Sequence, residues 1–193
     1  RMKKKFRSII IKALLLCVAF LFYLVFWPRS YNVLHLIDRA GSRYWNLPTG
    51  SMIGYTLIPA KGIKKPYPLI YLHGGPGAGI TDLEIKCLSP LSEDGYDVYL
   101  YDQVGSGHSG RLKNINEYSA DRHVKDLKEI VKKTGADKVI LIAQSWGSSL
   151  AVLFLADNPD KVAKIVITAP GPIQPERKEM ANISSPDSLH FRN

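Results

Sequence analysis

Short runs of apolar residues alternate along most of this chain with segments in which apolar positions recur at helical spacing. The runs are mostly apolar on both faces and lie at residues 68–73, 97–102, 138–144 and 162–168. Residues 119–134 have the helical spacing, with Ser119 as a suitable N-cap and Gly135 after the last turn. Residues 148–158 form a second helical segment, which Pro159 ends. Strands that are apolar on both faces are typical of a parallel sheet, so the pattern predicts an α/β fold, with a mostly parallel sheet and flanking helices.

The remaining segments of the chain have weaker patterns. Residues 51–58 are predicted to form an antiparallel edge strand or a hairpin. Residues 28–50 are mixed in polarity and contain two prolines, so they are predicted to be a linker. Residues 172–193 have no strand pattern and are predicted to lead into a part of the fold outside this sequence.

A long apolar segment lies near the N-terminus. Residues 13–27 are fifteen apolar residues in succession, and adding residues 9–11 across Lys12 gives about 28 Å of helix at about 1.5 Å per residue. Five basic residues precede it, which favours a cytoplasmic N-terminus and an extracytoplasmic domain. The sequence predicts a single-pass signal-anchor in the cell membrane, in contact with lipid. A cleaved signal peptide is the alternative, although no small-x-small cleavage site follows the run.

The charge of the chain supports this interpretation and excludes another. Of 26 basic residues, six lie among the first twelve with no acidic residue beside them, so the net charge of +9 falls to +3 for the rest of the chain. A nucleic-acid-binding protein would need basic residues spread over a folded face, and no nucleic-acid partner is predicted. Cys17 and Cys87 are too few and too far apart for a disulfide framework or a metal site, and neither a metal nor a cofactor is implied.

Glycine-rich segments follow two of the predicted strands. His73 is followed by Gly74, Gly75, Pro76 and Gly77, a turn that can leave N–H groups facing a cleft at the carboxyl edge of the sheet. Residues 105–110 match G-x-G-x-x-G, the dinucleotide-binding pattern, but the next predicted helix begins nine residues later. The glycines therefore do not open a helix, and residues 105–110 are predicted to be a structural loop that shapes the cleft.

The third strand end carries the most specific pattern. Ser145 lies where residues 138–144 join the next helix, with the small residues Ala143 and Gly147 two positions before and after it. A nucleophile elbow needs this arrangement, because larger side chains at the flanking positions would clash in so tight a turn. The N–H of Trp146, at the start of the helix, is predicted to face the same oxyanion as an N–H of Gly74 or Gly75.

Together these motifs resemble the α/β-hydrolase fold family and, within it, the proline iminopeptidase branch of the serine peptidases. The resemblance rests on H-G-G-P-G, D-Q-x-G-x-G-x-S and S-W-G-S in order, and it covers residues 51–171. It implies that Ser145 is the nucleophile, that Trp146 and Gly75 or Gly74 are the oxyanion donors, and that His73, Asp102 and Gln103 are structural residues at the cleft. Ala143 stands where the family has glycine, and Val104 where it commonly has arginine.

The catalytic acid and histidine of this family lie on later strand ends, and only 48 residues follow Ser145. Asp187 and His190 have the right order but follow no recognisable strand, so they are not assigned to a triad. The remaining histidines, His35, His108 and His123 among them, are predicted to be structural or solvated. We therefore expect a chain that ends before its acid and base, nearly inactive by itself, with an uncovered sheet edge at residues 162–168.

The resulting hypothesis is a membrane-anchored serine hydrolase, an aminopeptidase or esterase that acts through an acyl-enzyme on a small molecule or short peptide. The alternative is a catalytically inactive hydrolase-like domain used for binding. The predicted organisation is a cytoplasmic basic arm (1–7), a transmembrane signal-anchor helix (8–27), a linker (28–50), the N-terminal part of the hydrolase domain (51–171) and the start of a cap region (172–193).

Overall fold

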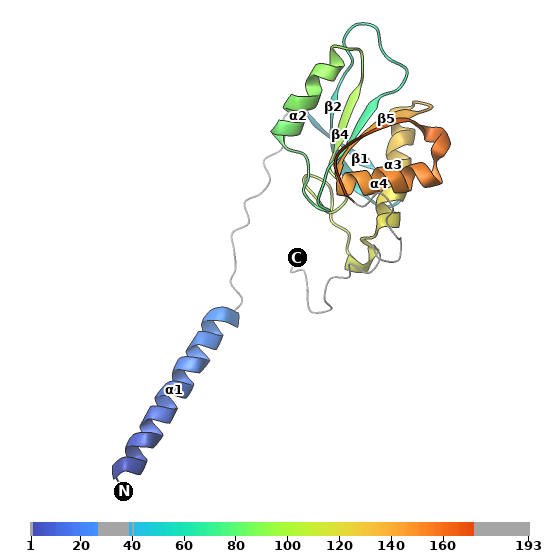
Figure 1. Ribbon diagram of the computed structural model, residues 1–193. Coiled ribbons are helices and arrows are strands. Elements are labelled where there is room, and N and C mark those ends of the chain that lie inside the picture. Colours follow the sequence, from blue (N-terminus) through green and yellow to red (C-terminus); the bar gives the residue numbers. More distant parts are fainter. Residues whose placement is uncertain (1, 27–38, 40, 172–193) are drawn as a thin grey trace. The chain divides into compact units, whose positions relative to one another are not determined.

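The computed structural model describes residues 2–26, 39 and 41–171, which belong to two separate units (Figure 1). The first unit contains helix α1 (Met2–Phe26), whose segment Lys5–Phe26 is long and apolar enough to cross a membrane. A signal sequence near an N-terminus meets the same criterion of length and composition. The predicted apolar helix is therefore present.

The second unit is built on a six-stranded sheet. Its strands are β1 (Ser42–Asn46), β2 (Met52–Ile58), β3 (Leu69–Leu72), β4 (Val98–Tyr101), β5 (Val139–Ser145) and β6 (Val162–Pro170). They lie in the order β1-β2-β4-β3-β5-β6. Neighbours among β4, β3, β5 and β6 are parallel, and β2 is antiparallel to both of its neighbours, β1 and β4. The mostly parallel sheet predicted from the apolar runs is confirmed.

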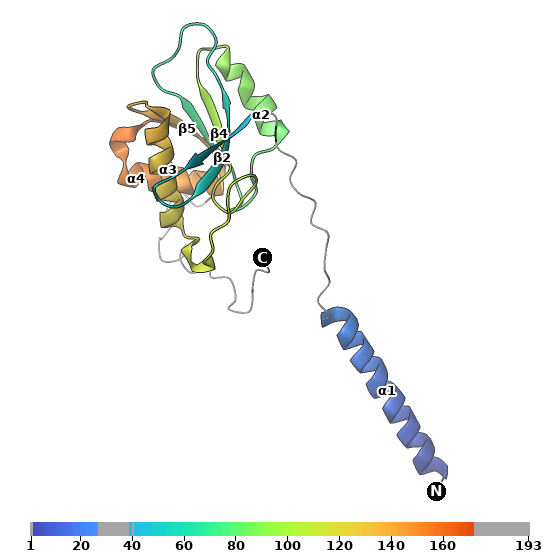
Figure 2. The same cartoon turned by 180° about the vertical axis from the view of Figure 1, so that it is seen from behind.

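Helices cover both faces of the sheet. Helix α2 (Asp82–Leu88) lies on one face, and α3 (Ala120–Thr134) and α4 (Trp146–Asp157) lie on the other, as the two opposite views show (Figure 1 and Figure 2). Side chains of β3 alternate between the two cores, with Leu69 and Tyr71 toward α2 and Ile70 and Leu72 toward α3 and α4. Burial on both faces is why these strands are continuous apolar runs in the sequence.

The caps predicted for α3 are both present. The Ser119 side chain accepts a hydrogen bond from the N–H of Arg122, and Gly135 ends the helix with a φ of 72°. Three short 3-10 helices also occur, at Ser89–Ser92, Ile115–Glu117 and Pro159–Lys161. Helix α4 begins at Trp146, two residues before the predicted segment, because the chain enters it directly from β5.

Two elements differ from the prediction. Strand β1 lies inside residues 28–50, which were predicted as a linker. Residues 51–58 therefore form the inner strand of a hairpin, which is one of the two forms predicted for them. Besides its pairing with β2, β1 is held by the ring of Trp45, which stacks on Tyr55 with 3.6 Å between ring centroids. None of its residues is fully buried, so no alternating apolar pattern marks the strand. Helix α2 was also missed, because none of its residues is fully buried, although Ile85 and Leu88 pack on the core and a capping box made by Thr81 and Glu84 begins the helix.

At the other side of the sheet, β6 pairs with β5 and with no further strand among the described residues. Most of its side chains are at least partly exposed, and Val166 is 43% exposed. The uncovered edge predicted for this strand is therefore present in the part of the chain that the structure describes.

Helix α4 packs so closely on the sheet that only glycine fits at its second residue. A Cβ on Gly147 would lie 2.1 Å from the carbonyl oxygen of Leu72 and 3.0 Å from that of His73. Both neighbours are backbone atoms of the β3 end, so neither can move aside as a side chain would. The contact fixes the distance between the start of α4 and the turn after β3.

We therefore predict that Gly147→Ala destabilises the globular unit by at least about 3 kcal/mol, because overpacking against backbone forces the two strand ends apart. The matched control is Gly135→Ala, where a Cβ meets nothing within 4 Å and the positive φ costs about 1 kcal/mol. Thermal unfolding of both variants, followed by circular dichroism, measures the difference. An equal loss of stability in the two variants would contradict the close packing of Gly147 on the end of β3.

Candidate active site

Ser145 lies at the join of β5 and α4, where the sequence predicts a nucleophile elbow. It is the last residue of β5 and immediately precedes α4, and its φ of 50° is in the left-handed region. A non-glycine residue in that region is strained by about 1–2 kcal/mol, so the surrounding structure must hold it there. Its side chain is partly exposed. The turn geometry expected of an elbow is present, and the role of Ser145 as nucleophile stays a prediction.

Ala143, which replaces the glycine of the family pattern, is accommodated in the core. It is fully buried, pairs with Leu72 in the sheet register and belongs to the cluster beneath α3 and α4. The extra methyl group therefore contributes apolar burial, and the elbow forms with alanine at this position.

The glycine turn after β3 closely approaches the elbow. A Cβ on Gly74 would lie 3.2 Å from the Cβ of Ser145. Gly75 has a φ of 114°, and a Cβ there would lie 2.5 Å from the backbone nitrogen of Gly77, so this turn requires glycine. The predicted oxyanion donors, in this turn and at Trp146, thus come from the two segments that meet at Ser145. Fixed backbone N–H groups of this kind suit an oxyanion because they need no reorganisation when charge develops.

His73 is buried at the end of β3, and both of its ring nitrogens have partners. The backbone N–H of Gln103 donates to Nε2 at 2.9 Å, which places the proton of the neutral ring on Nδ1, 2.8 Å from the carbonyl oxygen of Gly74. Burial lowers the pKa of His73 and so favours this neutral form. Because Nε2 already accepts a hydrogen bond, His73 is not placed to take a proton from a serine.

The side chain of Gln103 joins the other two strand ends. Its Oε1 accepts from the indole N–H of Trp146 at 2.9 Å, and its Nε2 donates to the carbonyl oxygen of His73 at 2.9 Å. The Trp146 ring also packs edge-on to His123, with 6.0 Å between ring centroids. Burial lowers the pKa of His123 to about 4, so this histidine is neutral at physiological pH. The sequence placed Gln103 at the cleft but did not predict its link to Trp146.

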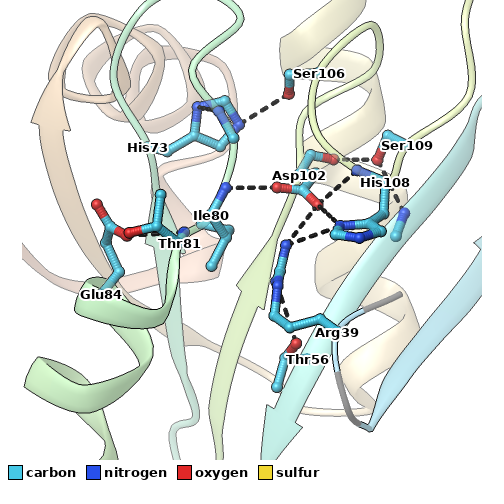
Figure 3. A network of polar contacts seen from close by, with 12 residues as sticks. Arg39, Thr56, His73, Ile80, Thr81, Glu84, Asp102, Ser106, His108 and Ser109 are labelled. Carbon is cyan, nitrogen blue, oxygen red and sulfur yellow. Dashed lines mark hydrogen bonds and ion pairs between the residues drawn. The ribbon is translucent and has the colours of Figure 1, made fainter. Parts of the chain in front are cut away.

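Asp102 is a fully buried carboxylate at the end of β4 and the centre of a polar network (Figure 3). One oxygen accepts from the backbone N–H of Ile80 at 2.6 Å, and the other from the N–H of His108 at 2.9 Å. The Arg39 guanidinium pairs with it at 3.1 Å and also contacts Thr56 and the His108 ring. Arg39 falls in the predicted linker, so its partnership with Asp102 was missed.

The glycine loop of residues 105–110 folds over this carboxylate. A Cβ on Gly107 would lie 2.3 Å from the Cγ of Asp102, and the N–H of Gly105 donates to the carbonyl oxygen of Gly110 at 2.9 Å. The glycines thus let the backbone close around Asp102 instead of opening a helix. This agrees with the predicted structural loop and not with a dinucleotide site.

No hydrogen bond joins the Ser145 hydroxyl to a histidine within residues 41–171. In that range, the histidines at 73 and 123 are placed as described above, and His108 contacts Asp102 at 3.3 Å. His35, Asp187 and His190 lie outside the described residues. The described part also holds no cluster of three side chains suited to a metal ion.

Comparison with known proteins fits this arrangement. A family model described as the alpha/beta hydrolase fold matches residues 67–187. A proline iminopeptidase of Lactobacillus delbrueckii subsp. bulgaricus is 34% identical over 127 residues, 64% of this chain and 42% of that protein. The chain thus spans about two fifths of the length of the curated relatives it matches.

Two solved structures have similar folds. The proline iminopeptidase of Mycobacterium smegmatis has a TM-score of 0.59 at 25% identity, covering 67% of this chain and 44% of that one. An epoxide hydrolase of Vigna radiata has a TM-score of 0.56 at 20% identity, and the match covers 65% of this chain and 38% of that one. This similarity is informative for the fold alone.

We predict that Arg39→Met destabilises the globular unit by about 3 kcal/mol, because it leaves the buried Asp102 carboxylate without its cation. The control is Arg43→Met, on an exposed position of β1, where a loss within about 0.5 kcal/mol is expected. Urea unfolding of the two variants measures both values. A loss for Arg39→Met as small as that for the control would contradict a stabilising role for the pair.

Proposed function

The chain belongs to the α/β-hydrolase fold family, and on that premise we propose that the protein is a membrane-anchored serine hydrolase, a proline iminopeptidase-like aminopeptidase or esterase. The observation that carries the proposal is Ser145, held at a φ of 50° between a buried strand and a helix, beside the glycine turn of residues 74 and 75. Such a turn lifts a serine hydroxyl above the edge of the sheet, where a substrate carbonyl can approach.

In the proposed reaction, the Ser145 Oγ attacks the carbonyl carbon of an ester or amide and loses its proton to a histidine base. The negative charge that develops on the carbonyl oxygen is held by the N–H of Trp146 and an N–H of Gly75 or Gly74. Collapse of the tetrahedral intermediate releases the amine or alcohol, which takes the proton from the histidine. Water then hydrolyses the acyl-enzyme by the same steps.

We propose that the base and its acidic partner come from outside the described residues. Within them, His73 is occupied by Gln103 and buried, and His123 packs on the indole ring of Trp146. The matched relatives are more than twice as long as the region they share with this chain, which leaves room for further strand ends carrying an acid and a histidine. Residues 41–171 by themselves are proposed to be nearly inactive.

The second candidate function is a hydrolase-like domain that binds without catalysis. It is favoured by the absence of a base beside Ser145 among residues 41–171. The two candidates differ in one chemical property, since only a serine activated by a base reacts rapidly with an electrophilic phosphonate.

We predict that the full-length protein is labelled by a fluorophosphonate probe and that Ser145→Ala abolishes the labelling and lowers ester turnover by at least about 1,000-fold. The control is Ser89→Ala, on a 3-10 helix away from the elbow. This variant should keep both the labelling and the ester turnover. Labelling is read by gel fluorescence and turnover with p-nitrophenyl acetate. Activity that survives in Ser145→Ala would refute the nucleophile, and no labelling of the wild type would favour the binding domain.

A second prediction concerns α1, which we propose is a single-pass anchor with its N-terminus in the cytoplasm. The basic residues before the apolar segment favour that orientation. Protease added to intact cells should digest the globular unit, and the intact protein should stay in the membrane pellet after alkaline carbonate washing. Protection of the globular unit, or its release in shortened form, would contradict an uncleaved anchor in this orientation.

A further inference from the structure

The three strand ends at the candidate active site are joined by a continuous path of hydrogen bonds through one buried side chain. The indole N–H of Trp146 donates to Gln103, and the amide of Gln103 donates to the carbonyl oxygen of His73, each at 2.9 Å. Trp146 follows the proposed nucleophile, and His73 precedes the glycine turn. Gln103 therefore connects the two segments that carry the proposed oxyanion donors.

We propose that Gln103 is a positioning residue, whose side-chain amide sets the spacing between the Trp146 N–H and the N–H groups of Gly74 and Gly75. This inference rests on the proposed function, since the spacing affects catalysis only if these groups hold an oxyanion. Displacing a donor weakens its hydrogen bond to the oxyanion more than it weakens ground-state contacts, so the effect should fall on kcat.

The two partners require a side chain that both accepts and donates at this position. An indole N–H can only donate and a backbone carbonyl can only accept, so the residue between them must accept at one end and donate at the other. Glutamine does both, whereas the carboxylate of glutamate would place an acceptor against the His73 carbonyl. Gln103 is 2% exposed, so water is not at hand to replace a lost partner.

The backbone of Gln103 is held independently of its side chain. Its N–H donates to the His73 ring at 2.9 Å, and its carbonyl accepts from the Ser106 hydroxyl at 2.7 Å. A change confined to the side chain therefore leaves these contacts in place. It should alter the distance between the elbow and the glycine turn without unfolding the loop after β4.

The experiment compares Gln103→Glu, Gln103→Met, Trp146→Phe and the double variant Gln103→Met with Trp146→Phe, all in the full-length protein. For each single variant we expect kcat for p-nitrophenyl acetate to fall about 10- to 100-fold and KM to change by less than about twofold. The fall in kcat should be smaller than that caused by deleting an oxyanion donor, because the donor is only displaced. The rate of inactivation by the fluorophosphonate should fall in parallel. Gln103→Met and Trp146→Phe both break the hydrogen bond between the Trp146 indole and Gln103. The kcat of the double variant should therefore be only slightly lower than that of either single variant.

Ser51→Ala is the control for lost stability alone. It removes the hydrogen bond from the Ser51 hydroxyl to Asp126 of α3, at 2.7 Å, together with the hydrogen bonds that this hydroxyl accepts from Arg122. The variant should have a lower melting temperature and an unchanged kcat. Trp146→Phe keeps most of the ring volume and tests the same bond if the Gln103 variants fail to fold. Unchanged kcat in folded variants, or additive losses in the double variant, would overturn the positioning role. If Ser145→Ala were as active as the wild type, the proposed function itself would fail, which is a distinguishable result.

Discussion

The buried carboxylate of Asp102 is the interaction on which the arrangement of the candidate site depends. An unpaired charge in that position would be costly, and the network satisfies it with backbone N–H groups from the loop after β3 and the loop after β4, together with the Arg39 guanidinium. Each donor comes from a different part of the chain. Hydrogen bonding to this one carboxylate therefore holds together the loops after β3 and β4, which the strand pairing alone does not connect.

A second buried network, around Gln103, serves the side of the site that faces Ser145. Its members are neutral, since burial lowers the pKa of His73 and the neighbouring groups are amide, hydroxyl and indole. Neutral hydrogen bonds fix positions at a smaller desolvation cost than ion pairs. In this network both ring nitrogens of His73 have hydrogen-bond partners, so the proposed mechanism takes its base from elsewhere.

The elements that could be predicted from the sequence are those whose signal is local. Continuous apolar runs indicated the parallel strands, Ser119 and Gly135 marked the ends of α3, and the small residues around Ser145 indicated the elbow. Strand β1 was missed because a strand with no fully buried residue has no alternating apolar pattern, and Arg39 was missed because its partner is 63 positions away. Long-range polar pairs leave no periodic trace in a sequence.

The conformation of Ser145 is compatible with the catalytic role proposed for it. Glycine would adopt a φ of 50° at little cost, whereas serine at that position costs about 1–2 kcal/mol. The surroundings hold the strain, because α4 is buried against the sheet and the Gly147 backbone lies directly on the end of β3. A turn that needed only to connect β5 to α4 would gain stability from glycine at position 145. Under the proposed function, serine is retained at this position for its hydroxyl, which the turn holds at the edge of the sheet.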